Sequence, residues 1–256
     1  MPLHASFNKG VANFSRGKYA LAEENFHHAY DLFLSSQGPM STDCLDAGMN
    51  LGVVLRVMGR YDEAEKYLEA CRLGRLEVLG EGHVKTVDCL HNIAILNDTR
   101  GMNVTAHTIY EECIERYTAL LGFDHPLTLE ARSNSLGNKF HMGEKFAATK
   151  GMERVLKMKE EKLGPQSVST LNSADNLACM YLRSAAEEEL SLAGLLFERV
   201  EKGLISRLGE GHFEVAKTRE NISIWHAKGG RFEEAVAYKD RAIEGYERVM
   251  GEGGKR

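Results

Sequence analysis

The sequence is poor in proline, in tryptophan and in closely spaced cysteines, and these shortages exclude several classes of protein. Its 256 residues include only 4 Pro and 1 Trp, with 43% hydrophobic and 27% charged residues, which excludes a disordered or collagen-like chain. Apolar runs are short and flanked by charges, so no membrane span is expected. The start of the chain, Met1 to Ser6, lacks the basic and apolar segments of a signal peptide. We therefore expect a soluble, cytoplasmic protein.

The charge balance and the cysteines narrow the chemistry further. Lys plus Arg number 32 and Asp plus Glu number 37, so the net charge of -5 attracts no nucleic acid as a partner. The cysteines are odd in number, 5 in all, and lie at least 18 residues apart, which supports neither a disulfide framework nor a zinc site. We expect small, buried, reduced thiols at Cys71 and Cys113.

A period of 42 residues runs through the chain. Asn, Ala and two Gly recur at fixed positions, and a jump of 45 residues places a three-residue insertion between Ala185 and Ala193. A period of this length is typical of stacked repeats, each of which buries its apolar face only against its neighbours. The predicted repeats are 1–38, 39–80, 81–122, 123–164, 165–209 and 210–251, in a single domain 1–251 followed by a flexible tail at 252–256.

Each repeat is predicted to form two helices. Apolar residues recur at four-residue steps from Thr42 to Met58, and Gly59 then interrupts the pattern. A second helix is expected from Tyr61 to Leu79, ended by Gly80 in the left-handed conformation. His83, His125 and His212 recur between repeats and are expected to stabilise these turns. The sequence thus predicts an all-α array of about six antiparallel helix hairpins.

The segment from Asn50 to Leu68, with Asn-Leu-Gly followed by Gly-Arg-Tyr-Asp-Glu-Ala-Glu, resembles a tetratricopeptide repeat. The 42-residue period and the Leu-Gly-x-x-His-Pro linker at Leu121 to Pro126 are similar to the kinesin light chain branch of that family. The resemblance covers nearly the whole chain. It implies a right-handed superhelical solenoid whose first helices line a concave groove, and it implies a non-catalytic scaffold for protein binding, of a cargo or adaptor type.

The repeated asparagine is the first candidate binding feature. An Asn inside a helix costs several tenths of a kcal/mol relative to Ala, so its repetition at one position requires a reason. Each amide could hold the main chain of an extended peptide, as the resemblance suggests, or it could bridge to the neighbouring repeat and fix the stacking. The candidate peptide-binding residues of this row are Asn50, Asn92, Asn134, Asn176 and Asn221.

Charged residues flank this row and change sign along the chain. They are acidic in the first half and basic in the second, so the ligand is expected to carry basic residues near one end and acidic residues near the other. The alternative is that these charges form only a solvated surface. The flanking candidates are Asp46, Asp88, Glu130, Arg183, Lys217 and Lys228.

Signals for catalysis and for metal or cofactor binding are weak. The chain lacks H-E-x-x-H, G-x-S-x-G and zinc-ligand spacings, so we predict no enzyme, no catalytic residue, no metal and no cofactor. Trp225 is assigned to packing or to ligand contact. The predicted function is peptide binding in the concave groove. The alternatives are a structural, self-associating array acting through its ends or convex face, and a small-molecule sensor.

Overall fold

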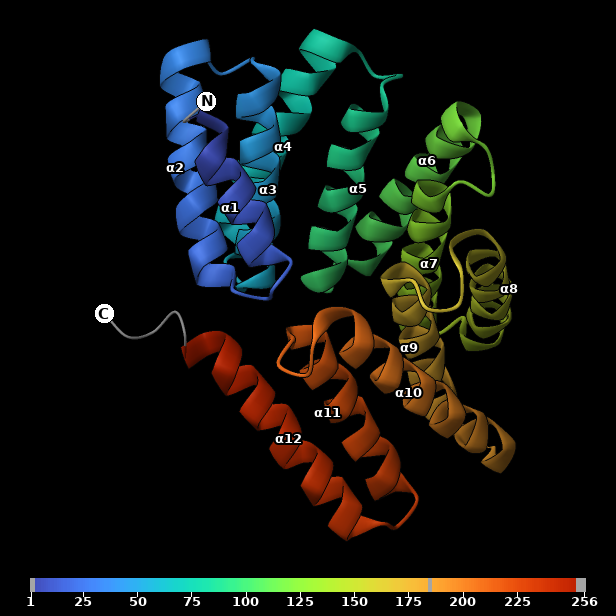
Figure 1. Cartoon of the computed structure of the whole chain (residues 1–256). Helices are drawn as coiled ribbons and strands as arrows, with labels where there is room; N and C mark the ends of the chain where they lie inside the picture. Colours follow the sequence, from blue (N-terminus) through green and yellow to red (C-terminus); the bar gives the residue numbers. More distant parts are fainter. Residues whose placement is uncertain (1–2, 184–185, 252–256) are drawn as a thin grey trace. The chain divides into compact units, whose positions relative to one another are not determined.

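The computed structural model describes residues 3–183 and 186–251, and within them it contains twelve α-helices and no strand (Figure 1). Contacts divide the chain into two compact units, Met1–Asn138 and Lys139–Arg256, with the boundary inside α7. The tail predicted at 252–256 lies outside the described residues. The helices are α1 (Leu3–Phe14), α2 (Tyr19–Gln37), α3 (Thr42–Val57), α4 (Tyr61–Leu79), α5 (Val84–Thr99), α6 (Asn103–Leu121), α7 (Pro126–His141), α8 (Lys145–Leu163), α9 (Val168–Leu182), α10 (Glu187–Leu208), α11 (Phe213–Lys228) and α12 (Phe232–Gly251).

The helix bounds follow the 42-residue period. The helices α3, α5 and α7 are each 16 residues long, and α4, α6 and α8 are each 19. The helix α10 has 22 residues, three more than α8, as expected if the predicted three-residue insertion lies within it. The all-α class and the alternation of first and second helices are therefore confirmed.

Repeated residues also end and begin the helices. Gly59 and Gly80 have φ of 79° and 80°, a conformation that costs glycine no steric strain and lets the chain leave one helix and enter the next. At the start of α3 the Ser41 hydroxyl accepts a hydrogen bond from the Cys44 N–H at 3.3 Å. At the equivalent position before α5, Nδ1 of His83 accepts from the Lys85 N–H at 3.1 Å, and His125 and His212 do the same. The predicted role of these histidines in the turns is confirmed.

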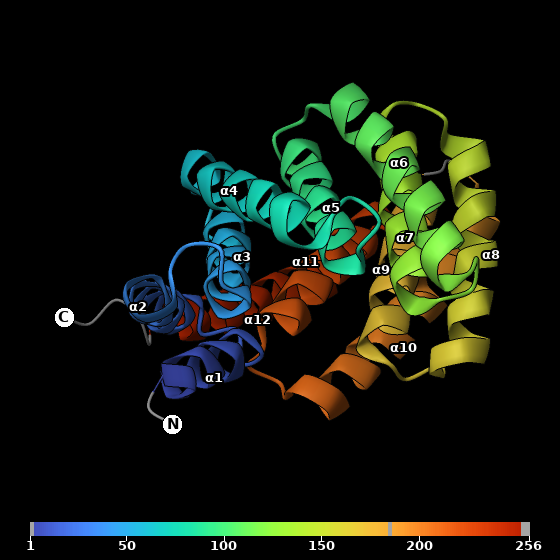
Figure 2. The same ribbon diagram turned by 90° about the horizontal axis from the view of Figure 1, so that it is seen from above.

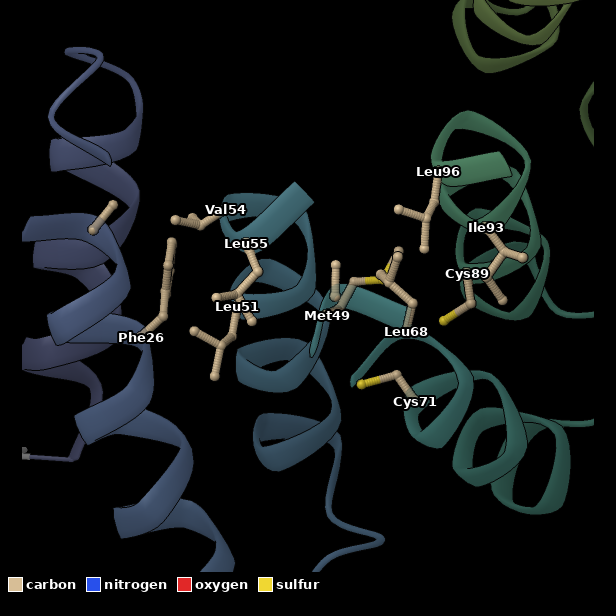
Figure 3. Close-up of a cluster of buried hydrophobic side chains, with 12 residues drawn as sticks. Phe26, Met49, Leu51, Val54, Leu55, Leu68, Cys71, Cys89, Ile93 and Leu96 are labelled. Atoms are coloured by element: carbon tan, nitrogen blue, oxygen red, sulfur yellow. The ribbon is translucent and has the colours of Figure 1, made fainter. Parts of the chain in front are cut away.

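The core of the first unit lies between consecutive helices (Figure 3). Phe26 of α2, Leu51 of α3, Leu68 of α4 and Leu96 of α5 are all 0–1% exposed. At Gly52 a methyl group would lie 2.9 Å from Leu68 Cδ2, so the two helices of this hairpin approach closely where the side chain is missing. Burying each of these leucines contributes about 1.5–3 kcal/mol.

Neighbouring hairpins pack through both kinds of helix. In the first unit α3 contacts α2 and α4, and it also contacts α5, the first helix of the next repeat. Figure 2 shows α1 to α6 of this unit as successive pairs. In the second unit α9 contacts α10 and α11. First helices of adjacent repeats are thus direct neighbours, which brings their repeated residues side by side. None of the helices in residues 3–183 and 186–251 has the length and apolar character needed to span a membrane.

Candidate functional site

The five predicted asparagines all lie on first helices, and all are half-buried. A half-buried position keeps part of each amide within reach of a ligand while its helix fixes the direction of the side chain. The row comprises Asn50 on α3, Asn92 on α5, Asn134 on α7, Asn176 on α9 and Asn221 on α11.

Asn50 and Asn92 bind within their own helices. The Nδ2 group of Asn50 donates to the Asp46 carbonyl oxygen at 2.8 Å, and that of Asn92 donates to the Asp88 carbonyl at 2.9 Å. Their Oδ1 atoms accept no hydrogen bond from the described residues and are not among the buried unpaired atoms. Both amide oxygens therefore stay open to an N–H donor from outside the chain.

Asn134 and Asn221 instead bridge between first helices. Nδ2 of Asn134 lies 3.1 Å from Nε2 of His91 on α5, and Nδ2 of Asn221 donates to Oδ2 of Asp175 on α9 at 3.1 Å. These contacts connect neighbouring repeats, as the stacking interpretation of the asparagines proposes. Asn176 has neither kind of contact, because its amide makes no hydrogen bond within the described residues.

Asp46 is held by two cations within the first unit. Oδ1 of Asp46 accepts from the guanidinium of Arg75 on α4 at 2.6 Å, and Oδ2 lies 2.8 Å from the Lys85 ammonium on α5. Arg75 is only 4% exposed and also donates to the Lys85 carbonyl oxygen at 2.9 Å. Asp46 therefore offers little net charge to a ligand.

Asp88 has a different partner at the equivalent position. The Tyr117 hydroxyl on α6 donates to Oδ1 of Asp88 at 2.6 Å. Burial raises the pKa of Asp88, and this hydrogen bond acts in the opposite direction. Arg75 and Tyr117 stand 42 residues apart on second helices, which is the spacing of the two aspartates, and this is the sequence signal that points to them. Glu130 is half-buried on α7.

The three basic candidates lie in different surroundings in the second unit. Lys228 donates to the Leu182 carbonyl oxygen at 2.6 Å and so caps the end of α9. Lys217 lies 3.3 Å from Glu214 on its own helix. Arg183 is exposed, and its guanidinium lies 5.9 Å from the centre of the Phe140 ring. Among the described residues Arg183 has no ion-pair partner, so it is the basic candidate most open to a ligand.

A cavity of about 220 Å³ adjoins Arg183. Its floor includes Phe140 and Met180, each 5% exposed, and Phe146 at its rim is 79% exposed. An apolar floor beside an unpaired guanidinium can take a side chain that carries an adjacent acceptor. The remaining lining residues are Lys145, Thr149, Lys150 and Glu189.

Trp225 serves packing at the insertion in α10. Its indole N–H donates to the Leu190 carbonyl oxygen at 2.8 Å, and the Arg231 guanidinium lies 4.3 Å from the ring centre. A methyl group on Gly194 would lie 2.2 Å from the ring, so the indole packs directly on α10. Part of the ring also lines a cavity of about 530 Å³.

No metal-binding cluster of three or more His, Cys, Asp or Glu occurs in the described parts of the chain. All five cysteines are free, and burial raises the pKa of Cys71, Cys113 and Cys179 to about 12. A thiol with this pKa is almost entirely protonated at neutral pH and is a poor nucleophile.

Comparison with known sequences identifies two matching segments. Two sequence profiles, both described as tetratricopeptide repeat, match residues 43–119 and 215–253. The chain matches no curated protein sequence.

Several solved structures have a similar fold. A Rap protein complexed with competence and sporulation factor has 12% identity, with 97% of this chain and 76% of that chain covered and a TM-score of 0.71. BtubC (BKLC) from P. vanneervenii has 16% identity, with 98% and 94% covered and a TM-score of 0.60. A putative kinesin light chain from Podosopora anserina, with nearly identical TPR-like repeats, has 18% identity, with 80% and 96% covered and a TM-score of 0.58. At these identities the likeness concerns the fold.

Proposed function

Because the chain belongs to the tetratricopeptide repeat family, a family of protein-interaction scaffolds, we propose that it binds an extended peptide segment of a partner protein along its first helices. Proteins of this family are in general non-catalytic, and we propose the same here. The proposed site is the row of repeated asparagines with the residues that flank it.

The observation that carries this proposal is the set of open amide groups at one position of the repeat. Asn50 and Asn92 keep Oδ1 free, and Asn176 keeps its whole amide free of hydrogen bonds from the described residues. An extended peptide presents main-chain N–H and C=O groups at regular intervals, which such amides can accept and donate to. Because these contacts use only the main chain, they give affinity with little dependence on ligand sequence.

An apolar row beside the asparagines supplies contacts for ligand side chains. Val53, Ile95 and Cys179 are half-buried, and Ile224 is 53% exposed. They lie one turn beyond the asparagines on α3, α5, α9 and α11, so both rows share one face of each helix.

Among the charged candidates, Arg183 is the one we expect to contribute most to ligand binding. Asp46 and Asp88 already have partners, whereas the Arg183 guanidinium has no ion pair among the described residues and borders an apolar cavity. We propose that an acidic ligand residue lies near Arg183 and sets the register. Glu130, Lys217 and Lys228 would then tune the ligand's orientation more than its affinity, and Asp46 and Asp88, which are bound within the fold, would contribute less.

Two comparisons add support by analogy of fold. The Rap conjugation gene regulator of the plasmid pLS20 has a similar fold, and its structure was solved in complex with the Phr* peptide. The kinesin-light-chain-like relatives support a cargo-type or adaptor-type role within the same proposal. Free, buried cysteines support a reducing, cytoplasmic location.

Peptide arrays probed with the whole protein test this proposal. The double variant Asn92→Ala with Asn176→Ala should weaken binding of the selected peptide by about 1–3 kcal/mol, because hydrogen bonds are lost, while its melting temperature stays within a few degrees of wild type. Equal affinity of the two proteins for every peptide selected by the wild type would contradict the proposal.

Self-association is the second candidate function, and α12 favours it. Phe232, Val236 and Ile243 are 66%, 61% and 44% exposed and lie on one face of this helix. Sedimentation over a concentration series tests it. A dimer that Val236→Glu converts to a monomer would support it, and a monomer at all concentrations would exclude it.

A further inference from the structure

Arg56 lies near the end of α3, in surroundings that peptide binding at the asparagine row does not explain. It follows two core residues, Val54 and Leu55, which are 0% and 1% exposed. Its Nε is buried without a hydrogen-bond partner. In the part of the chain that the structure describes, the Arg56 side chain makes no hydrogen bond and no ion pair.

No carboxylate of the described residues pairs directly with Arg56. Burial lowers the pKa of Arg56, and the groups that act against this are the phenols of Tyr110, Tyr61 and Tyr19, which are neutral at physiological pH. A buried cation without a partner is costly, because the interior does not replace the water that it loses. Buried polar groups in native structures are nearly always paired, so an unpaired one calls for an explanation.

Arg75, in the last turns of the following helix α4, shows how this chain normally treats a buried arginine. It donates to Oδ1 of Asp46 at 2.6 Å, to the Lys85 carbonyl oxygen at 2.9 Å and to Sγ of Cys89 at 3.3 Å. The guanidinium of Arg75 is thus compensated within the fold. Arg56 lies in the same unit and has none of these contacts.

Ligands can reach the part of Arg56 that lacks partners. The residue as a whole is half-buried, and Nε is the single Arg56 atom among the buried unpaired atoms of the described chain. The two terminal nitrogens are also unpaired but are not among these fully buried atoms, so they keep some accessible surface. A guanidinium in this setting presents parallel N–H donors that match the two oxygens of a carboxylate or a phosphate.

We propose that Arg56 is the centre of an anion-binding site that takes an oxyanion, either a carboxylate or a phosphate group. The anion supplies the negative charge that Arg56 lacks as a partner within the fold. Binding therefore stabilises the folded protein, because the buried cation is then compensated. This inference concerns a different set of side chains from the asparagine row and does not depend on peptide binding there.

Stability measurements on the full chain give the first test. In a chloride buffer of low ionic strength, Arg56→Met and Arg56→Gln should melt at least about 2 °C above wild type, since an uncompensated charge is removed. Arg75→Met is the matched control and should melt below wild type, because it removes one of the two cations that bind Asp46. Melting of both Arg56 variants below wild type would assign Arg56 a structural role and overturn the proposal.

Anion titration gives the second test and identifies the kind of oxyanion. Inorganic phosphate and acetate are added separately at matched ionic strength, and both the melting temperature and the Arg Nε–Hε signals in nitrogen-15 NMR are followed. A saturable rise in melting temperature with a shift of the Arg56 signal, absent in Arg56→Met, is expected for at least one anion. The anion with the lower midpoint shows whether phosphate or carboxylate is preferred. An equal response of wild type and Arg56→Met to both anions would overturn the proposal.

Discussion

The hydroxyl of Tyr117 donates a 2.6 Å hydrogen bond to Oδ1 of Asp88, and this contact occupies the place that an ion pair fills one repeat earlier. In the earlier repeat Arg75 binds Asp46, also at 2.6 Å. The two partners are 42 residues apart, as are the two aspartates. One position of the hairpin thus joins its first and second helices in both repeats, while the chemistry of the contact changes.

Loss of the Tyr117 hydroxyl should destabilise the first unit. Tyr117→Phe keeps the ring, which is 0% exposed, but removes the donor to the half-buried carboxylate of Asp88. The expected loss is about 1–3 kcal/mol in the free energy of unfolding, measured by urea denaturation. Tyr67→Phe is the control, because the Tyr67 hydroxyl makes no hydrogen bond within the described residues, and its effect should stay within about 0.5 kcal/mol. Similar losses in both variants would show that the Asp88 contact adds no stability.

The fold could be predicted from sequence because it depends on local, repeated signals. Gly59 and Gly80 end helices at positions that require a positive φ, and the period then places every later helix. The insertion could also be located from the 45-residue jump in the period, and α10 is indeed three residues longer than α8. Such features need only neighbours in sequence and a fixed spacing.

Which candidate residues are open to a ligand depends on side-chain contacts that the 42-residue period alone does not show. The sequence predicts Asp46 and Asp88 as charges that flank the asparagine row, yet each binds a side chain 29 residues later on the second helix. The asparagine row also divides, because Asn134 and Asn221 find partners on the preceding first helix whereas Asn176 does not. The repeat therefore predicts where each residue lies on its helix. It does not predict the hydrogen-bond partner, which depends on the residue that the neighbouring helix presents at that point.

Asn221 and Asn176 should separate stacking from ligand binding. Asn221→Ala removes a donor to the buried Asp175 and should lower the free energy of unfolding by about 1–3 kcal/mol. Asn176→Ala removes no hydrogen bond within the described residues, so its effect should stay within about 0.5 kcal/mol. Guanidinium denaturation of the two variants decides it, and equal losses would show that Asn176 also holds the fold.

Asp175 should make stability fall as pH rises above the ordinary range of a carboxyl group. Burial raises its pKa in the folded state, against the smaller effects of Lys217 and of the hydrogen bonds from Thr218 and Asn221. Between the unfolded pKa and the raised folded pKa the native state holds the extra proton, so unfolding becomes easier as pH increases through this window. Each unit of pKa difference corresponds to about 1.4 kcal/mol.

Asp175→Asn removes this titration and isolates its contribution. The free energy of unfolding of wild type should fall relative to that of Asp175→Asn as pH is raised from about 4, and the difference should level off once the folded-state carboxyl is ionised. Denaturation of both proteins at a series of pH values gives the difference directly. A difference that is constant with pH would mean that Asp175 titrates alike in the folded and unfolded chains.

Substitution by Ala should change the free energy of unfolding in opposite directions at two helical glycines, Gly194 and Gly137. A methyl group at Gly194 on α10 would lie 2.2 Å from Cζ2 of Trp225, a large ring whose N–H is fixed to the Leu190 carbonyl oxygen. The ring can move only by giving up that hydrogen bond and its contact with Arg231. At Gly137 on α7 no atom lies within 4 Å of the added methyl.

Gly194→Ala should therefore destabilise the protein by about 1–3 kcal/mol through overpacking, even though Ala is the better helix former. Gly137→Ala should stabilise it by about 0.5–1 kcal/mol, because the unfolded chain loses conformational freedom and nothing in the helix is displaced. Urea denaturation of both variants provides the comparison, with the fluorescence of Trp225, the single tryptophan, as a local probe. If Gly194→Ala stabilised the protein and left this fluorescence unchanged, the indole would not be packed on α10.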